Sequence, residues 1–291
     1  MNIGITGATG FIGKAIIDMA LQRGHEVIAF TRRPERVIPG CTMRAFSIDW
    51  APDISGCDAI IHLAGESIFG LWTPAKQQRI FESRVQGTRR VVEAINASAR
   101  KPEVFVCGSA VGFYGDGGDA ELTEDSPAGG NFLAETVAAW EWEALKTDQV
   151  RTVMLRTSLV LGRGGGALAT MLPMFRAYLG AQFGDGQQWM PWIHLEDEAR
   201  LALFAIENLD IQGPINATAP WPVRNAEFTQ TLARTLRRPA LLCVPDFALK
   251  TLGGLARELL ASQRVLPAAA LESGYGFRFS ELEPALKDLV G

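Results

Sequence analysis

Short apolar runs and longer helix-periodic segments alternate through the first two thirds of the chain. The apolar runs predict strands at residues 1–5, 25–30, 43–46, 58–65, 104–107 and 152–156. Apolar residues recurring with a helical period predict helices at 11–21, 74–99 and 132–146. This order is typical of right-handed β-α-β units. It therefore predicts an α/β protein built on a doubly wound parallel sheet.

The section 162–192 interrupts this rhythm, because it is rich in glycine and bulky apolar residues. We expect it to form a loop-and-helix insertion, with Gly164–Gly166 as a flexible lid, over the carboxyl edge of the sheet. A helix at 195–207, a short strand at 214–217 and a helix at 225–236 follow. The pattern then predicts a main domain at 1–238 and a small, mainly helical module at 239–291 on the substrate side.

The segment Thr6-Gly7-Ala8-Thr9-Gly10-Phe11-Ile12-Gly13 joins the first predicted strand to the first predicted helix. Glycine at 7 and 10 lets the backbone turn sharply and approach a phosphate, and Gly13 lets the helix lie close to the strand. The helix N-terminus offers unpaired N–H groups and a positive dipole end to an anion. We predict a dinucleotide site here rather than a purely structural turn, with contacts from Gly7, Thr9, Gly10, Phe11 and Ile12.

The residues after the second predicted strand indicate which dinucleotide is bound. An NAD site usually has an acidic residue near this point, which binds the ribose 2′-hydroxyl. Here the chain reads Thr31-Arg32-Arg33. A guanidinium can pair with a 2′-phosphate, which a carboxylate would repel. We therefore predict NADP(H) over NAD(H); the alternative is that both arginines lie in a solvated loop.

Composition excludes several other functions. A net charge of −4 and the lack of a basic run give no reason to expect nucleic acid as a partner. No apolar run approaches the roughly 20 residues that span a bilayer, so we expect no membrane association. The four scattered cysteines and the immediate first strand favour a reduced cytoplasmic protein without a signal peptide. We expect the protein to act on a small molecule and to bind no metal ion. The sequence leaves open whether it forms an oligomer.

Three motifs resemble the extended short-chain dehydrogenase/reductase family: Thr6-Gly7-x-x-Gly10-x-x-Gly13, His62-Leu63-Ala64-Gly65 and Gly108-Ser109-Ala110-Val111-Gly112-Phe113-Tyr114-Gly115. Further runs resemble an atypical subgroup of epimerase-family (nucleoside-diphosphate-sugar-epimerase-like) proteins with its own small C-terminal domain: Ser83-Arg84, Leu155-Arg156-Thr157 and Trp192-Ile193-His194. The resemblance covers essentially the whole chain. It implies a Rossmann fold and NADP binding, but no particular substrate.

The resemblance also implies further cofactor contacts. Leu63, Ala64 and Gly65 would approach the cofactor ribose at the end of the fourth strand. Glu66 could hold a ribose hydroxyl or simply begin the next loop. Arg84 could reach the pyrophosphate or a ribose, or it could form an ion pair within its own helix.

The chain departs from the family at the catalytic pair. Catalytic members use a tyrosine and a lysine four residues later on one helical face, where the lysine lowers the phenol pKa. No Tyr-x-x-x-Lys occurs in this chain, and Phe132 stands where the tyrosine hydroxyl is expected. Because phenylalanine cannot transfer a proton, the family's usual mechanism is excluded.

Three residues are candidates for the missing chemistry. Ser109 aligns with the family's carbonyl-polarising serine, although it could instead cap its turn. Tyr114 could replace the missing acid or brace its loop, and Glu135 could act as a base or lie in solvent. We expect their pocket between the carboxyl edge of the sheet and the insertion, framed by Trp189 and Trp192.

These features predict an NADP(H)-binding oxidoreductase or epimerase that acts on an unknown small carbonyl or hydroxyl compound. Loss of the catalytic pair favours a rival from another class, a sensor that binds NADPH without turnover. A sugar-nucleotide epimerase usually needs tightly bound NAD, so Arg32 and Arg33 count against that third possibility.

Overall fold

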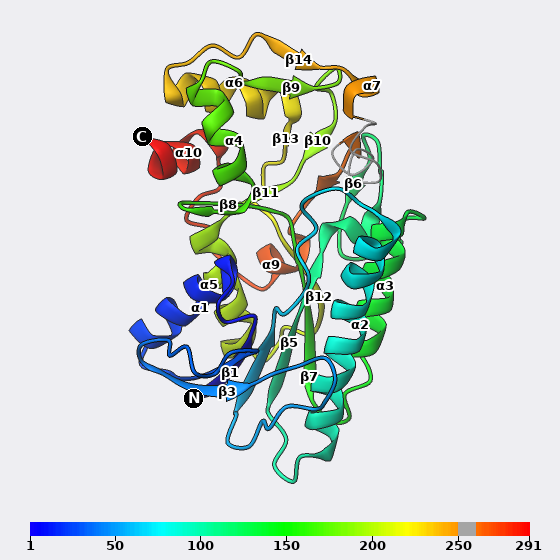
Figure 1. Cartoon of the computed structure of the whole chain (residues 1–291), viewed down its shortest axis with the longest axis vertical. Helices are drawn as coiled ribbons and strands as arrows, with labels where there is room; N and C mark the ends of the chain where they lie inside the picture. Colours follow the sequence, from blue (N-terminus) through cyan, green and yellow to red (C-terminus); the bar gives the residue numbers. More distant parts are fainter. Residues whose placement is uncertain (250–259) are drawn as a thin grey trace.

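A seven-stranded parallel sheet forms the centre of the computed structural model, which describes residues 1–249 and 260–291. Its strand order is β3-β2-β1-β4-β5-β7-β12 (Figure 1). The strands are β1 (Asn2–Thr6), β2 (Glu26–Thr31), β3 (Cys41–Ala45), β4 (Ala59–His62), β5 (Val104–Ala110), β7 (Arg151–Thr157) and β12 (Gly213–Ala217). The predicted α/β class and doubly wound parallel sheet are confirmed.

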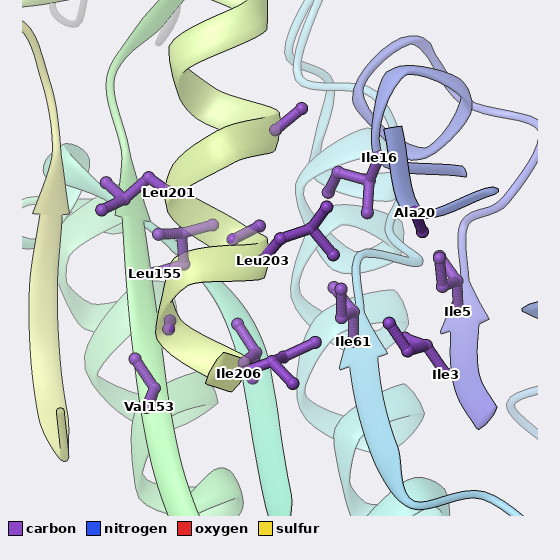
Figure 2. Packing of buried hydrophobic residues seen from close by; sticks show 14 of the residues in the cluster. Ile3, Ile5, Ile16, Ala20, Ile61, Val153, Leu155, Leu201, Leu203 and Ile206 are labelled. Carbon is purple, nitrogen blue, oxygen red and sulfur yellow. The ribbon is translucent and has the colours of Figure 1, made fainter. Parts of the chain in front are cut away.

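Helices cover both faces of this sheet (Figure 1). On one face lie α1 (Phe11–Gln22) and α5 (Leu195–Glu207), and on the other α2 (Pro74–Ala97) and α3 (Phe132–Ala144). Ile3 and Ile5 of β1 pack with Ile16 of α1 and Leu203 of α5 in the larger core (Figure 2). Alternate strand residues, such as Phe105 of β5, fill the second core against α2 and α3.

The fourth strand is shorter than the apolar run predicts. It ends at His62 instead of continuing to Gly65. The N–H groups of Leu63 and Ala64 both donate to the hydroxyl of Thr6, at 3.1 and 3.2 Å. The N–H of Leu63 is shared with the backbone carbonyl of Thr6 at 3.3 Å, so regular pairing with β1 ends at this residue and the turn after β4 begins there.

The region 162–192 contains more strands than the predicted loop and helix. It holds α4 (Gly166–Arg176), β9 (Ala181–Phe183), β10 (Trp189–Met190) and β11 (Trp192–His194), and β8 (Leu159–Gly162) precedes it. β11 pairs in parallel with β8, and β10 pairs with β13 (Val223–Arg224). Trp192 is fully buried against Phe228 and Leu168, so it cannot frame an open pocket as predicted.

Residues after α6 (Asn225–Leu236) pair with elements from much earlier in the chain. β14 (Leu242–Val244) joins β9, and β15 (Arg264–Val265) joins β6 (Glu121–Leu122). The remaining helices are α7 (Asp246–Leu249), α9 (Ala268–Glu272) and α10 (Leu282–Val290), together with the 3-10 helix η1 (Val111–Tyr114). Part of the predicted 239–291 module, residues 250–259, lies outside the described residues.

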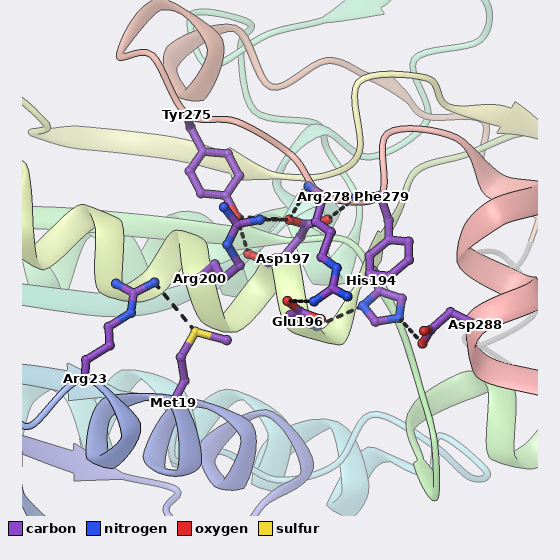
Figure 3. Close-up of polar contacts among 10 residues, drawn as sticks. All are labelled: Met19, Arg23, His194, Glu196, Asp197, Arg200, Tyr275, Arg278, Phe279 and Asp288. Atoms are coloured by element: carbon purple, nitrogen blue, oxygen red, sulfur yellow. Dashed lines mark hydrogen bonds and ion pairs between the residues drawn. The ribbon is translucent and has the colours of Figure 1, made fainter.

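A buried carboxylate attaches the last residues of the chain to α5 (Figure 3). Asp197 accepts hydrogen bonds from the backbone N–H groups of Arg278 and Phe279, at 2.9 and 2.8 Å, and from the hydroxyl of Tyr275. His194 caps α5 and stacks on Phe279. Throughout residues 1–249 and 260–291, no helix combines the length and apolar character needed to cross a bilayer.

Candidate functional site

The glycine turn between β1 and α1 has the geometry that a dinucleotide pyrophosphate needs. Gly7 has φ +69°, and a Cβ there would lie 2.8 Å from the carbonyl carbon of Leu63. A Cβ on Gly13 would collide with the carbonyl oxygen of Gly7. Gly10 directly precedes α1 and has no side chain that could cap the helix. The first turn of the helix, from Phe11 to Lys14, contains no carboxylate. The exposed helix N-terminus is therefore free to bind an anion.

The end of β4 lies beside this turn because Thr6 holds it there. The Thr6 hydroxyl accepts two backbone N–H groups, so its own hydrogen is directed to Nδ1 of His62, 2.6 Å away. Burial lowers the pKa of His62 to about 3, so the imidazole is neutral and its Nδ1 can accept. The structure thus brings Leu63, Ala64 and Gly65 next to the glycine turn.

The predicted arginines follow β2 at the same edge of the sheet. Arg32 and Arg33 are exposed, and the hydroxyl of Thr31 accepts the backbone N–H of Arg33 at 3.3 Å. Thr9 and Gly10 are exposed as well, whereas Phe11 and Ile12 are half-buried. Phe11 lies against the start of the insertion, since a Cβ on Gly162 would come within 2.5 Å of its ring.

Glu66 lies among several cations, two of which the sequence analysis missed. Its carboxylate is 2.7 Å from Nζ of Lys76 and 3.8 Å from Nε of Arg79. The hydrogen bond from Lys76, followed by the charges of Lys76, Arg79 and Arg32, lowers the pKa of Glu66. Lys76 and Arg79 are three residues apart in α2 and share a helical face, a spacing visible in the sequence. Only the fold reveals that this face meets Glu66.

Arg84 also reaches the loop after β4. It donates to the backbone carbonyl of Glu66 at 2.9 Å and to that of Ile80 at 3.2 Å. Burial lowers the pKa of the Arg84 guanidinium to about 10. In this structure Arg84 contacts the backbone of the loop and does not form an ion pair with its helical neighbour Glu82.

Two of the three catalytic candidates belong to one buried polar network. Ser109, at the end of β5, donates to Glu141 of α3 at 2.5 Å. Arg156 of β7 pairs with both oxygens of Glu141 at 2.8 and 2.9 Å and donates to the hydroxyl of Tyr114 at 2.9 Å. Tyr114 in turn donates to Oδ1 of Asn216 at 2.7 Å.

Burial sets the protonation state of Tyr114. Burial raises the pKa of the phenol to about 12, despite the neighbouring Arg156 charge. Tyr114 is therefore a neutral hydrogen-bond partner at physiological pH. Glu135 does not join this network, because it is exposed in the first turn of α3.

Glu141 is a network member that the sequence analysis missed. Its side chain is buried on α3. In the sequence it stands between Trp140 and Trp142, and no charged residue lies three or four positions away to indicate an ion-pair partner. The helical face expected to carry the tyrosine and lysine has Phe132 and Thr136 instead. Phe132 packs on Trp72, and the Thr136 hydroxyl donates to the Phe132 carbonyl.

Comparisons with known proteins agree with this geometry. Residues 3–217 match the family described as NAD dependent epimerase/dehydratase, and residues 244–289 match a domain of unknown function (DUF1731). The chain is 39% identical over 302 residues to an epimerase family protein SDR39U1 homolog, chloroplastic, from Arabidopsis thaliana, covering all of this chain and 87% of the relative. It is 38% identical over 301 residues to human epimerase family protein SDR39U1, with both chains fully covered.

A solved structure extends the match. The crystal structure of human epimerase family protein SDR39U1 (isoform 2) with NADPH superposes with a TM-score of 0.93 at 36% identity, covering 100% of this chain and 99% of that one. The resemblance predicted from the sequence motifs is confirmed over the full length. The chain belongs to the NAD-dependent epimerase/dehydratase family.

Proposed function

We propose that this protein binds NADP(H) across the glycine turn between β1 and α1. The observation that carries the proposal is the combination of this turn, into which no Cβ fits at Gly7, with the exposed Arg32 after β2. The human relative crystallised with NADPH supports the same assignment. Gly7, Thr9, Gly10, Phe11 and Ile12 would surround the pyrophosphate, Leu63, Ala64 and Gly65 the ribose, and Thr31, Arg32 and Arg33 the 2′-phosphate. Glu66 would hold a ribose hydroxyl, and Arg84 would reach the pyrophosphate or a ribose.

A fluorescence titration tests the cofactor assignment. The native protein should bind NADPH more tightly than NADH, because a guanidinium pairs with the 2′-phosphate. Arg32→Ala should weaken NADPH binding by roughly 1.5–3 kcal/mol, the range for hydrogen bonds to charged groups. Arg36→Ala, at an exposed arginine in the same loop, serves as the control. Equal affinities for the two cofactors in the native protein would contradict the assignment.

We further propose that the protein is an oxidoreductase or epimerase acting on a small carbonyl or hydroxyl compound. The bound nicotinamide supplies hydride transfer. Ser109 would polarise the reacting carbonyl, and Tyr114, Glu135 or a water would handle the proton. Ser109 donates its only hydrogen to Glu141 in this structure, so this role requires the serine to exchange that bond for one to the substrate.

Monitoring NADPH absorbance across a panel of carbonyl and quinone compounds tests this activity. Turnover that Ser109→Ala abolishes, while NADPH affinity is retained, supports a catalytic serine. Turnover that survives Ser109→Ala contradicts the role given to that residue.

A specific observation favours a second candidate, a sensor that binds NADPH without turnover. The hydroxyls of Ser109 and Tyr114 are both engaged by buried partners, and Phe132 replaces the family's tyrosine. NADPH binding without turnover on any compound would support the sensor over the enzyme.

We propose that the protein acts on a small molecule in the reducing cytoplasm. All four cysteines, Cys41, Cys57, Cys107 and Cys243, are free thiols. Fractionation of the expressing cells tests this location.

A further inference from the structure

One carboxylate is surrounded by four cations at the edge of the proposed cofactor site. Lys76 and Arg79 form ion pairs with Glu66, while Arg84 binds the backbone carbonyl of the same residue. Arg32 is close enough for its charge to lower the pKa of Glu66, after the larger effects of Lys76 and Arg79. The cluster consists of Arg32, Glu66, Lys76, Arg79 and Arg84, and we call it the Glu66 cluster.

The Glu66 cluster has an excess of positive charge, because Glu66 is the one carboxylate among these five residues. The Lys76 side chain is only 13% exposed, so its ammonium is held in place mainly by Glu66 at 2.7 Å. Arg79 is 57% exposed and its nearest approach to Glu66 is a long 3.8 Å. Arg79 can therefore turn towards another anion with little loss.

The place of the Glu66 cluster in the fold suggests which anion this is. Arg32 follows β2 and Glu66 follows β4, and these two strands flank β1 in the sheet. The glycine turn follows β1, so the cluster lies across the path of a dinucleotide that extends from the turn towards β2. In this arrangement the adenosine end of the cofactor would lie between the two loops.

We propose that Glu66 acts as an internal competitor for the 2′-phosphate of NADP(H), and that Lys76 and Arg79 are phosphate ligands in addition to Arg32. This inference rests on the proposed NADP(H) binding. A phosphate monoester carries about −1.5 to −2 charges and three acceptor oxygens, so it displaces a single carboxylate from the cations. The neutral 2′-hydroxyl of NAD(H) cannot do so. Glu66 therefore contributes to cofactor choice by excluding ligands without the phosphate.

Two small probes isolate the 2′-phosphate from the rest of the cofactor: adenosine 2′,5′-bisphosphate and 5′-AMP. Calorimetry with each probe gives its dissociation constant. Lys76→Gln and Arg79→Gln should each weaken bisphosphate binding by roughly tenfold and leave 5′-AMP binding unchanged. Glu66→Gln should strengthen bisphosphate binding relative to 5′-AMP binding. Lys76→Arg, which keeps the charge, should restore most of the affinity.

Arg89→Gln is the matched control, because it makes the same charge change in the same helix. Arg89 lies ten residues beyond Arg79, which is about 15 Å along α2, and pairs with Glu143. It should leave both dissociation constants unchanged. Thermal melts of every variant establish that each is folded.

The possible results separate the two proposals. If Lys76→Gln and Arg79→Gln do not change bisphosphate binding, or change both probes equally, this inference is wrong while NADP(H) binding can still stand. Weaker bisphosphate binding in Glu66→Gln would also overturn it, because Glu66 would then be a ligand and not a competitor. If the native protein binds neither NADPH nor the bisphosphate, the proposed function itself fails.

Discussion

The hydroxyl of Ser109 and the carboxylate of Glu141 are joined by a 2.5 Å hydrogen bond. Glu141 also receives two hydrogen bonds from Arg156, so a buried ion pair lies directly behind the serine. A hydroxyl has one hydrogen, and Ser109 cannot donate it to Glu141 and to a substrate carbonyl at the same time. If Ser109 gives up this bond to a substrate, the protein can act as an enzyme that uses Ser109. If the bond to Glu141 persists, the protein only binds its cofactor.

Removing the cation of the buried Arg156–Glu141 pair should destabilise the folded protein strongly. Arg156→Met leaves the buried Glu141 without its cation, which should lower the free energy of unfolding by roughly 3–5 kcal/mol. Urea denaturation of native and variant protein measures the change. Arg89→Met removes a half-exposed cation from the buried Glu143, which keeps Lys146 as a partner at 2.8 Å, and should cost no more than about 1 kcal/mol. Similar losses in the two variants would show that Arg156 contributes no more than the half-exposed Arg89.

The contribution of Glu198 to stability should fall as the pH rises from about 4.5 to 8, opposing the gain from neutral, buried His62 as the pH rises towards 6.5. This side chain is fully buried on α5, and burial raises its pKa from 4.5 to about 8. Over this range the carboxyl ionises in the unfolded chain and stays protonated in the folded one. Its contribution to stability is therefore complete below pH 4.5 and lost as pH rises. The loss is about 3 kcal/mol between pH 4.5 and 7.

Glu198→Gln should remove this contribution, since an amide does not ionise, so the stability of the variant relative to the native protein should increase as the pH rises. Urea denaturation of both proteins at several pH values between 4.5 and 8.5 measures it. Glu196→Gln, in the same turn of α5 but half-exposed, should retain the native slope. An unchanged slope in Glu198→Gln would assign the pH dependence to other groups.

Substitution of Gly7 should be costly for two reasons, its positive φ and the close backbone of Leu63. Gly24, which has only the positive φ, separates the two effects. Both have positive φ, +69° and +79°, but a Cβ on Gly24 meets nothing within 4 Å. Gly24→Ala should cost roughly 1 kcal/mol from backbone strain alone. Gly7→Ala should cost roughly 3 kcal/mol, because its Cβ also collides with the backbone of Leu63.

Only Gly7→Ala should affect the cofactor. Its affinity for NADPH should fall by about tenfold or more, equivalent to about 1.4 kcal/mol, because the turn must move. Fluorescence titration of both folded variants provides the measurement. An equal effect of the two substitutions on NADPH affinity would argue against the glycine turn as the binding site.

The contacts of Asp197 predict a local effect at the end of the chain. Asp197→Ala removes the acceptor for the N–H groups of Arg278 and Phe279 and should lower the free energy of unfolding by roughly 2–4 kcal/mol. Compared with the native protein, hydrogen exchange in Asp197→Ala should accelerate more at these two amides than at the amides of α5 or the sheet. Glu196→Gln, which weakens a half-exposed pair with Arg278, should change stability by no more than about 1 kcal/mol. Unaltered exchange at both amides in Asp197→Ala would contradict this assignment.

The periodicity of the sequence was sufficient to predict the central sheet and its covering helices. Short apolar runs such as Met1–Ile5 or Val104–Cys107 predict strands when helical segments separate them. Strands of two or three residues, such as Trp189–Met190, carry no such periodic signal. Their partners lie far away in the sequence, as Ala181 does from Leu242, so the insertion could be predicted only as a loop and a helix.

The cofactor turn could be predicted because its residues are contiguous. The polar network and the Glu66 cluster could not, because their members come from different elements. In the sequence, Lys76 and Arg79 look like residues on an ordinary solvated face of a helix. Glu141 likewise looks like a helix residue exposed to solvent. Their roles depend on which element packs against that face, and a single sequence does not contain this information.

The late pairings of β14 with β9 and of β15 with β6 bear on how the protein is made. During synthesis the ribosome releases β6 and β9 long before residues 242–265, so these two early strands wait for their partners while the central sheet is already able to form. The two small sheets that β14 forms with β9 and β15 forms with β6 can be completed only in the final stage of translation. A nascent chain stalled before residue 242 should therefore contain a formed nucleotide-binding core beneath an incomplete upper layer.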